Sequence, residues 1–461
     1  MNSEVSAQHA PDRETQVETL VILAELGHEE QVRAGIATLH PADIASLLNA
    51  IEEGDIKQKI FNFLSPDLAS EVLSLVSPLT REELTQDLSD AVLSDLVERL
   101  DSDDAADLLG SLSQEQVRSV LGQVPEELSA EMERLLRYPA DTAGGIMQTE
   151  HVEVPEGTRV DEAIEIIRRH VDEVPDIHSI FVVDHKRYLT GVLPLRKLIL
   201  ARSDELVENV MDRQVVAARV DLDQEQVAQL FKKYYDLLSL PVVDQTGQLL
   251  GRITIDDIVD VMEEEATEDI YKLAGLGGEE EVLDSAARSI RRRLPWLALN
   301  LLTTTLSATV ISFFEGTIQK VAIAAAFMTM VAAQGGNSGI QTLTVIVRGL
   351  ALGEVSLSHT KRVLFKEILV AAGNGVALGI TAGVVAYLWK GEPLIGVVLA
   401  LALIVNLIIA AFVGSMIPFT MRRFGVDPAI ASNVIVTACT DICGFFSFLG
   451  ILSLYLHFFS G

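Results

Sequence analysis

The chain has 461 residues, with 66 Asp and Glu against 35 Lys and Arg, which gives a net charge of −31 at pH 7. Residues 285–461 hold only six acids and twelve bases, so the first 284 residues carry a net charge of −37. This acidity argues against a nucleic-acid partner, because phosphate would be repelled, and it favours cations. An acidic soluble part joined to an apolar part with basic edges is typical of a membrane protein with a cytoplasmic portion.

The N-terminal part, residues 1–137, predicts an all-α domain. Similar phrases recur from His40 (HPADIASLLNAI), from Ser65 (SPDLASEVLSLV) and from Asp101 (DSDDAADLLGSL). Each combines a helix-start signal with Ala and Leu at helical spacing, which predicts short amphipathic helices stacked as a superhelix. The first residues lack a basic region followed by an apolar run, so we expect no cleavable signal peptide.

An internal repeat follows the helical region. The segment from Phe181 to Leu200 matches the segment from Pro241 to Asp260 at an offset of sixty residues. Each copy predicts strand, turn, strand and helix, preceded by an amphipathic helix (160–170 and 224–235). The pattern resembles a tandem pair of CBS domains, α/β modules that are commonly regulatory. We place them at residues 138–202 and 203–265.

Acidic residues line one face of the helix that follows the second repeat. Asp257, Asp260, Glu264 and Glu268 follow spacings of three, four and four, and Glu265 and Asp269 adjoin them. Like charges at these spacings destabilise a helix by roughly 0.2–0.5 kcal/mol per pair. A solvated face is one interpretation, but the position between the repeat and the apolar part favours a cation-binding stripe. Asp223 and Glu225 add acid from the second repeat. The linker from Tyr271 to Arg293 predicts a connecting helix after the break GLGG. As a domain, we place this connecting helix at residues 266–290.

The apolar part, residues 291–461, predicts a transmembrane domain of five helices. The stretches run from Leu294 to Phe314, Ile318 to Val347 (interrupted), Leu364 to Trp389, Leu394 to Thr420 and Ala429 to Phe459. Each is near the roughly 20 residues that a spanning helix needs. With alternate loops assigned to the inside, ten Lys and Arg lie inside and two, Lys320 and Lys390, lie outside. This bias predicts a multi-pass protein of the inner membrane, with a cytoplasmic N-terminus and the C-terminus outside.

Asp441 is the only acid in the interior of an apolar stretch. A membrane carboxylate costs at least about 2.5 kcal/mol, so it normally faces a pore or a partner. The alternatives are an Asp paired with a base or capping a kinked helix, but no Lys or Arg lies in the interior of a predicted span. Asn433 and Thr437 lie eight and four residues earlier, on the same helix face, and add oxygen atoms. Oxygen ligands suit a hard cation such as Mg²⁺.

Two other features of the apolar part are open to more than one interpretation. The segment QGGNSGIQ, from Gln334 to Gln341, is either a break in the helix that lines a cavity or a site of close helix packing. Cys439 and Cys443 lie at i and i+4, but no His or Met cluster accompanies them. We therefore interpret the cysteines as small packing residues.

The whole architecture resembles the MgtE family of magnesium channels. The motifs that carry the resemblance are TAGGIM (from Thr142), EATEDIYKL (from Glu265), GGNSGIQ (from Gly335), GVDPA (from Gly425) and the Thr440-Asp441 pair followed by Gly444. The resemblance implies a homodimer in the membrane lipid with one pore on its two-fold axis. Asp441 of each subunit would recognise a hydrated Mg²⁺, and Asn433 would help to line the path.

The resemblance also implies regulatory cation sites and no enzymatic activity. The family's cytosolic acids fall on Asp223, Glu225, Asp257, Asp260, Glu265, Glu268 and Asp269, with Asp427 near the inner mouth of the pore. Family members also bind ATP between the CBS domains, although the sequence has no glycine loop that would cradle phosphate. Ile340 stands where some relatives have a second Asn. Mn²⁺ and Co²⁺ therefore stay open as the main ion.

The charges suggest a feedback mechanism, in which facing carboxylates repel at low internal Mg²⁺ and are bridged at high Mg²⁺, closing the pore. Three rival interpretations remain. The first is a CBS-regulated transporter of another ion, for example an anion channel; the second is an intramembrane enzyme; the third is a sensor without transport. An anion channel needs anion sites within the spans, and an enzyme needs a nucleophile and base that the apolar part lacks.

Overall fold

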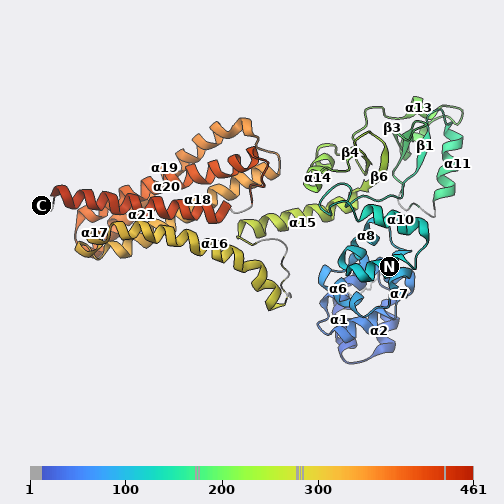
Figure 1. Cartoon of the computed structure of the whole chain (residues 1–461), viewed down its shortest axis with the longest axis horizontal. Coiled ribbons are helices and arrows are strands. Elements are labelled where there is room, and N and C mark those ends of the chain that lie inside the picture. The colour runs from blue at the N-terminus through green and yellow to red at the C-terminus, as the bar shows by residue number, and fades with distance from the viewer. Residues whose placement is uncertain are drawn as a thin grey trace, which may run out of the picture. The chain divides into compact units, whose positions relative to one another are not determined.

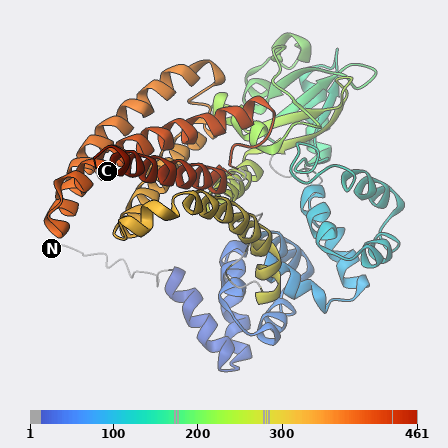
Figure 2. The same ribbon diagram turned by 60° about the vertical axis from the view of Figure 1, so that its left-hand side comes forward.

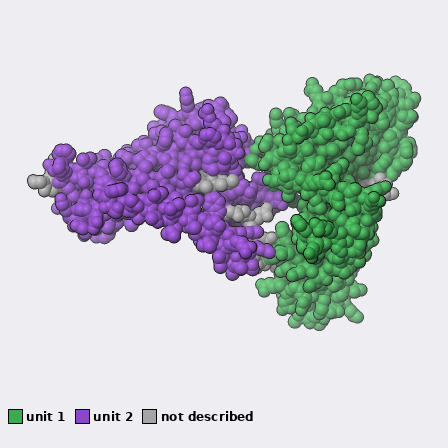
Figure 3. Space-filling model, in the orientation of Figure 1, with its two compact units in different colours: residues 1–262 green, residues 263–461 purple. Residues whose placement is uncertain are grey.

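In a computed structural model of the chain, residues 13–171, 174, 177–276, 280, 282, 285–429 and 432–459 are described. They form two compact units, which divide between Met262 and Glu263 (Figures 1 and 3). The first unit combines short helices with two small sheets, and the second consists of helices. The order of a helical domain, a repeat with two small sheets and an apolar helical domain agrees with the order expected from the sequence.

Short helices build the N-terminal domain. They are α1 (Arg13–Glu25), α2 (Glu29–Ile36), α3 (Pro41–Ala50), α4 (Gly54–Phe61), α5 (Pro66–Leu75), α6 (Pro78–Gln86), α7 (Asp90–Val97), α8 (Ser102–Ser111), α9 (Gln114–Leu121) and α10 (Glu126–Leu135). The three expected helix starts are found at α3, α5 and α8. The Ser65 hydroxyl accepts a hydrogen bond from the Leu68 amide, and Ser113 forms a capping box with Gln116 at the start of α9. Because such caps satisfy the amides at a helix start, the sequence can begin a new helix every ten to fifteen residues or so.

The two CBS repeats have the same topology. The first contains β1 (Glu153–Pro155), α11 (Val160–His170), β2 (Ser179–Val183), β3 (Leu189–Pro194), α12 (Leu195–Leu200) and α13 (Val207–Val210). The second contains β4 (Ala218–Arg219), α14 (Gln224–Lys233), β5 (Ser239–Val243) and β6 (Leu249–Thr254). In each sheet the first strand is parallel and the third antiparallel to the central strand. The ladder also shifts at the same point in each copy, between Val182 and Val183 and between Val242 and Val243.

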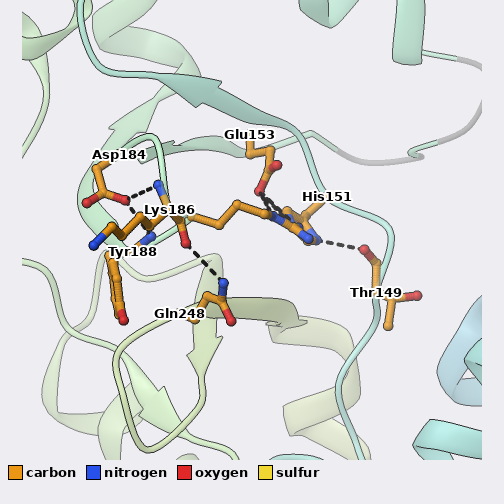
Figure 4. Close-up of polar contacts among 8 residues, drawn as sticks. Thr149, His151, Glu153, Asp184, Lys186, Tyr188 and Gln248 are labelled. Atoms are coloured by element: carbon orange, nitrogen blue, oxygen red, sulfur yellow. Dashed lines mark hydrogen bonds and ion pairs between the residues drawn. The ribbon is translucent and has the colours of Figure 1, made fainter.

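Matching residues of the repeat make matching contacts in the turns. The Asp184 carboxylate accepts hydrogen bonds from the amides of Lys186 (2.8 Å) and Tyr188 (3.0 Å), as Figure 4 shows. The Asp244 carboxylate accepts the same bonds from Thr246 and Gln248. The two turns also meet, because the Gln248 amide group donates to the Lys186 carbonyl at 3.0 Å (Figure 4). The repeated aspartates therefore shape the turns by which the two CBS domains pair.

The segment before β1 connects the helical domain with the CBS pair. The Thr149 amide donates to the Ser102 hydroxyl at 2.8 Å, and that hydroxyl donates to Glu150 at 2.7 Å. Next to them the His151 ring lies between the Thr149 carbonyl (2.6 Å) and the Glu153 carboxylate (3.7 Å), as Figure 4 shows. Buried residues of the helical domain and of the second CBS domain share one hydrophobic core. These two parts are therefore packed together within the first unit.

A long helix, α15 (Ile255–Leu273), continues from the last strand of the second repeat. The predicted connecting helix differs from the structure, because α15 ends at Leu273 and the next helix, α16 (Ala286–Phe313), begins at Ala286. Gly275 has a positive φ of 78°, which favours glycine and ends the helix. Part of the GLGG break, residues 277 and 278, lies outside the described residues. The acidic stripe and the connection are thus one helix that begins inside the second repeat.

The second unit is a bundle of long helices. After α16 come α17 (Glu315–Lys320), α18 (Ala324–Ala351), a 3₁₀ turn η1 (Leu357–His359), α19 (Thr360–Lys390), α20 (Pro393–Arg423) and α21 (Ser432–Phe459). Four of the five expected spans are confirmed as helices long and apolar enough to cross a membrane. The exception is α18, which has 28 residues but contains polar residues such as Gln334, Asn337 and Gln341. Its span, like the orientation of the bundle, stays a prediction.

The glycine-rich segment of α18 allows close helix packing and does not break the helix. The helix is continuous from Ala324 to Ala351. A methyl group at Gly339 would collide with Val436 of α21, and one at Gly414 of α20 would lie 2.7 Å from the Gly339 carbonyl. Small residues therefore let α18, α20 and α21 run side by side (Figures 1 and 2). Of the two interpretations of this segment, the structure supports packing.

Candidate cation sites

Asp441 lies half-buried on α21, on a polar stripe that runs through the apolar bundle. The Thr437 hydroxyl donates to the Asn433 side-chain oxygen at 3.3 Å, so these two residues share a face, as the spacing predicted. Among the described residues, no basic side chain pairs with Asp441. Asp441 follows Thr440, which is fully buried, as is Val436 earlier on the same helix. An unneutralised carboxylate in an apolar domain is a candidate site for a cation.

A buried asparagine fixes the position of α21. Asn406 of α20 is fully buried, and its amide donates to the Val331 carbonyl of α18 at 2.9 Å. Gly335 of α18 and Gly444 of α21 both lie against it, so closely that a methyl group at either position would collide with its amide. Gly444 is one turn beyond Asp441 on the same helix. Asn406 thus hydrogen-bonds α18 and packs closely against Gly444 of α21, next to the candidate site.

Glu367 is a second acid of the bundle, near the start of the third predicted span. It is 6% exposed, and its carboxylate accepts bonds from Lys366 (2.6 Å) and from the Thr342 hydroxyl of α18 (3.4 Å). Because both oxygens have partners, Glu367 joins α19 to α18 and is not left in need of a cation. This neutralised acid contrasts with Asp441.

In the first unit, acids from two domains face each other. We call Asp103 and Asp104 of α8, with Asp257 of α15, the Asp103 cluster. Asp257 caps the start of α15, because one oxygen accepts from the Thr254 amide (3.1 Å) and hydroxyl (2.5 Å). Asp103 lies near Asp257, and its Oδ1 atom is buried without a hydrogen-bond partner. A buried carboxylate oxygen without a partner costs free energy, which a cation would recover.

Burial and mutual repulsion make the Asp103 cluster difficult to ionise. Burial, with the charges of Asp257 and Asp104, raises the pKa of Asp103 far above its ordinary value. Burial also raises the pKa of Asp104 to about 7, although the positive charge of Arg81 opposes this. Arg252 of β6 is 2% exposed and is attracted by Asp257, but one guanidinium does not balance the cluster. When these carboxyls ionise, excess negative charge lies between the helical domain and the second CBS domain, and a bound cation would favour that ionised form.

The oxygen atoms of the Asp103 cluster fit a hydrated divalent cation better than a bare one. Within the described ranges, no three His, Cys, Asp or Glu side chains converge closely enough to hold a metal ion directly. Mg²⁺ keeps several of its waters and is usually bound through one or two carboxylates. Two facing aspartates, one with a free oxygen, meet that requirement. These residues would hold the ion by electrostatic attraction and by hydrogen bonds to its bound waters.

In the second unit, the end of α15 meets the loop between α20 and α21. We call Glu268, Asp269, Lys272 and Asp427 the Asp427 cluster. The Lys272 ammonium lies 2.6 Å from Glu268 and 2.6 Å from Asp427. Burial and the charge of Asp427 raise the pKa of Asp269 to about 6. Leu273 packs against Leu343, Val347, Ala429 and Val436, which anchors this end of α15 to the bundle.

The remaining residues predicted from the sequence lie outside the Asp103 cluster and the Asp427 cluster. Asp223 caps α14, accepting from the Glu225 amide at 2.9 Å, and Glu225 accepts from the Gln229 side chain at 3.3 Å. Asp260 is exposed on α15 and Glu265 is half-buried. Asp223 and Glu225 make local hydrogen bonds on α14 and stay predicted cation ligands, whereas the structure brings Glu268, Asp269 and Asp427 together.

Sequence reasoning missed Asp103, Asp104, Lys272 and Asn406. The phrase DSDDAADLLGSL was available as a signal, since four acids at the start of one helix exceed what a helix cap needs. Lys272 follows the acidic stripe directly, where a lysine on a helix surface is not exceptional. Asn406, a polar residue inside the most apolar helix, is the kind of exception that indicates a buried hydrogen bond.

Three family models match the chain. The model described as a divalent cation transporter matches residues 328–451, the MgtE intracellular N domain matches residues 39–141, and CBS domains match residues 143–204 and 207–264. These ranges cover most of the bundle, most of the helical domain and the two repeats.

Named relatives and one solved structure agree with these matches. The chain is 39% identical to the magnesium transporter MgtE of Thermus thermophilus over 71% of this chain and 73% of that protein. It is 35% identical to the magnesium transporter MgtE of Bacillus subtilis over 71% of this chain and 73% of that one. The crystal structure of the cytosolic domain of the Mg²⁺ channel MgtE in complex with ATP matches with a TM-score of 0.50 and 36% identity, over 53% of this chain and 99% of that one. The chain therefore belongs to the MgtE family of transporters.

Proposed function

We propose that the protein conducts Mg²⁺ across the inner membrane and that its acidic cytosolic domains close the pore when internal Mg²⁺ is high. The observation that carries the transport part is Asp441, a half-buried carboxylate on an apolar helix that no described base neutralises. The relatives, at 35–39% identity, are named magnesium transporters. A hydrated Mg²⁺ would be recognised through its waters by Asp441 and Asn433.

Two copies of the chain would form the pore in this proposal. A single Asp441 offers one carboxylate, whereas two copies related by a two-fold axis would place a pair around a hydrated ion. A cysteine introduced at position 441 tests this, because it should form a disulfide-linked dimer under oxidising conditions. Its background should be a chain with Cys439 and Cys443 replaced by Ala. Failure to cross-link, with the protein monomeric in mild detergent, would contradict the shared pore.

Transport itself is tested by ion uptake into liposomes that contain the purified chain. We expect Mg²⁺ uptake that falls at least about tenfold in Asp441→Asn, because the change removes the charge and keeps the shape. Mn²⁺ and Co²⁺ should be measured in parallel, since one of them is the alternative main ion. Uptake of an anion, or uptake unaffected by Asp441→Asn, would favour the rival transporter or the sensor.

The feedback part is supported by the excess charge of the Asp103 cluster. A ligand shifts a conformational equilibrium only if it binds one state better, and a cation between α8 and α15 would bind the compact state better. Asp257→Asn with Asp260→Asn should therefore raise the Mg²⁺ concentration needed for closure and leave permeation intact. Protease cleavage of the cytosolic part that is the same with and without Mg²⁺ would contradict the mechanism.

Nucleotide binding and orientation complete the proposal. The cytosolic MgtE domain to which this chain is 36% identical was crystallised with ATP. We therefore propose that ATP binds the CBS pair here, which calorimetry on the purified chain would test. The N-terminus would be cytoplasmic and the C-terminus outside, because basic residues gather at one side of the predicted spans. A reporter fused to the C-terminus that is active only outside would support this orientation.

A further inference from the structure

Lys272 lies between two carboxylates that belong to different elements. Its ammonium lies 2.6 Å from a Glu268 oxygen and 2.6 Å from an Asp427 oxygen, so it bridges α15 and the α20–α21 loop. Its side chain is 16% exposed, and those of Glu268 and Asp427 are 35% and 32% exposed. A pair with this degree of burial is screened less by salt than a surface pair.

The carboxylates around Lys272 exceed what one ammonium balances. Burial alone would lower the pKa of Lys272, but hydrogen bonds to Asp427 and Glu268 outweigh it and raise that pKa. Asp269 adds a third acid, whose pKa is raised by burial and by the charge of Asp427. Three acids and one lysine leave a net charge of −2 when all are ionised. The surroundings therefore attract a second, mobile cation, but the nearest oxygens are already engaged.

The geometry of the loop is fixed independently of Lys272. The other oxygen of Asp427 accepts a hydrogen bond from the Ala429 amide at 2.8 Å, which orients the carboxylate. Leu273, the next residue after Lys272, packs into the apolar contact with Leu343, Val347 and Val436. Removing the lysine charge would therefore leave the acids in place and without their counter-ion.

We propose that the Lys272 ammonium is a built-in competitor of the divalent cation at the Asp427 cluster, and that it sets the cation concentration at which this cluster binds. To bind Glu268 and Asp427, a divalent cation has to displace the ammonium, so the lysine weakens binding. This inference rests on the proposed function for the identity of the ion. It assigns to Lys272 a role that the acidic stripe alone does not explain.

A simple structural role makes the opposite prediction. If Lys272 only fastens α15 to the loop, its loss loosens the cluster and weakens cation binding. If Lys272 competes, its loss leaves three unbalanced carboxylates and strengthens binding. The sign of the change in affinity therefore separates the two roles.

The experiment uses the full chain in lipid nanodiscs, titrated with Mg²⁺ and followed by amide hydrogen exchange of residues 265–273. In Lys272→Met, which removes the charge and keeps a long side chain, the midpoint of Mg²⁺-dependent protection should fall about fivefold. In Lys272→Arg it should stay within about twofold of the wild type. Lys232→Met, which removes an exposed lysine of α14, is the matched control and should change nothing.

A midpoint that rises or stays the same in Lys272→Met would overturn the inference. Mg²⁺ uptake by the wild-type chain in liposomes separates this failure from failure of the proposed function. Uptake that is present while Lys272→Met leaves the midpoint unchanged contradicts only the role of Lys272. No uptake of Mg²⁺ by the wild type contradicts the proposed function itself.

Discussion

The two ends of α15 carry similar acids in different surroundings. At its start, Asp257 faces Asp103 of α8, whose Oδ1 atom has no hydrogen-bond partner. At its end, Glu268 and Asp427 share the ammonium of Lys272. The second cluster thus has an ammonium in contact with its carboxylates, whereas the first keeps a buried carboxylate oxygen without a hydrogen-bond partner. Acids at helical spacing therefore do not reveal by themselves where a cation is needed, because residues from other elements decide it.

The largest expected effect comes from neutralising the start of α15. In Asp103→Asn with Asp257→Asn, the repulsion is removed, so the Mg²⁺-free chain should unfold at a temperature higher by about 4 °C. Added Mg²⁺ should stabilise this variant little, whereas it should stabilise the wild type. Thermal unfolding of the detergent-solubilised chain with and without Mg²⁺ measures both. Asp236→Asn, at an exposed aspartate, is the control. Equal stabilisation of the wild type, the double variant and the control by Mg²⁺ would show that Asp103 and Asp257 do not bind the cation.

A substitution in α21 that changes a steric contact and no charge provides a reference for the charge variants. In Gly444→Ala the new methyl group meets the Asn406 amide at 2.7 Å, so we expect a loss of about 1–3 kcal/mol of stability and a lower uptake of Mg²⁺. Gly450→Ala, on the same helix with no atom within 4 Å of the new methyl group, should be neutral or slightly stabilising. Thermal unfolding in detergent compares them. Equal stability of the two variants would show that Asn406 does not hold α21 in register.

The pH dependence should be smaller and has a definite sign. Burial raises the pKa of Asp104 to about 7 and that of Asp269 to about 6. A carboxyl with a raised pKa in the folded state favours folding at low pH and loses this contribution as pH rises through the folded value. Without Mg²⁺, protease resistance of the cytosolic part should therefore fall mainly between about pH 4 and pH 7, by a few-fold in cleavage rate. Saturating Mg²⁺ should flatten this profile, and a profile that is the same in both conditions would argue against cation sites at these acids.

The fold was largely predictable, because its signals are local. Helix starts such as Ser65 and the sixty-residue repeat with its aspartates at 184 and 244 follow from caps and turns that a short segment specifies. The glycines of α18 could not be interpreted from sequence, because Gly339 depends on Val436, about a hundred residues away. The end of α15 at Leu273 also differed from the connecting helix that was expected.

The candidate site was predictable only where a residue was exceptional in its own segment. Asp441 is such a residue, because it is an acid within an apolar helix. Asp103 and Lys272 are not, since acids and lysines are common on helix surfaces. Their importance comes from Asp257 and Asp427, which the chain brings to them from far away in the sequence. Long-range contacts of this kind leave no periodic pattern to read.

The most direct test of the central claim is the uptake of Mg²⁺ into liposomes as the Mg²⁺ concentration on the cytosolic side is varied, for the wild type and for Asp441→Ala. We predict uptake that depends on Asp441 and that decreases as cytosolic Mg²⁺ rises. Asp441-dependent uptake that stays constant over the whole range of cytosolic Mg²⁺ would contradict regulation by the acidic domains. Uptake that does not depend on Asp441 would contradict the pore.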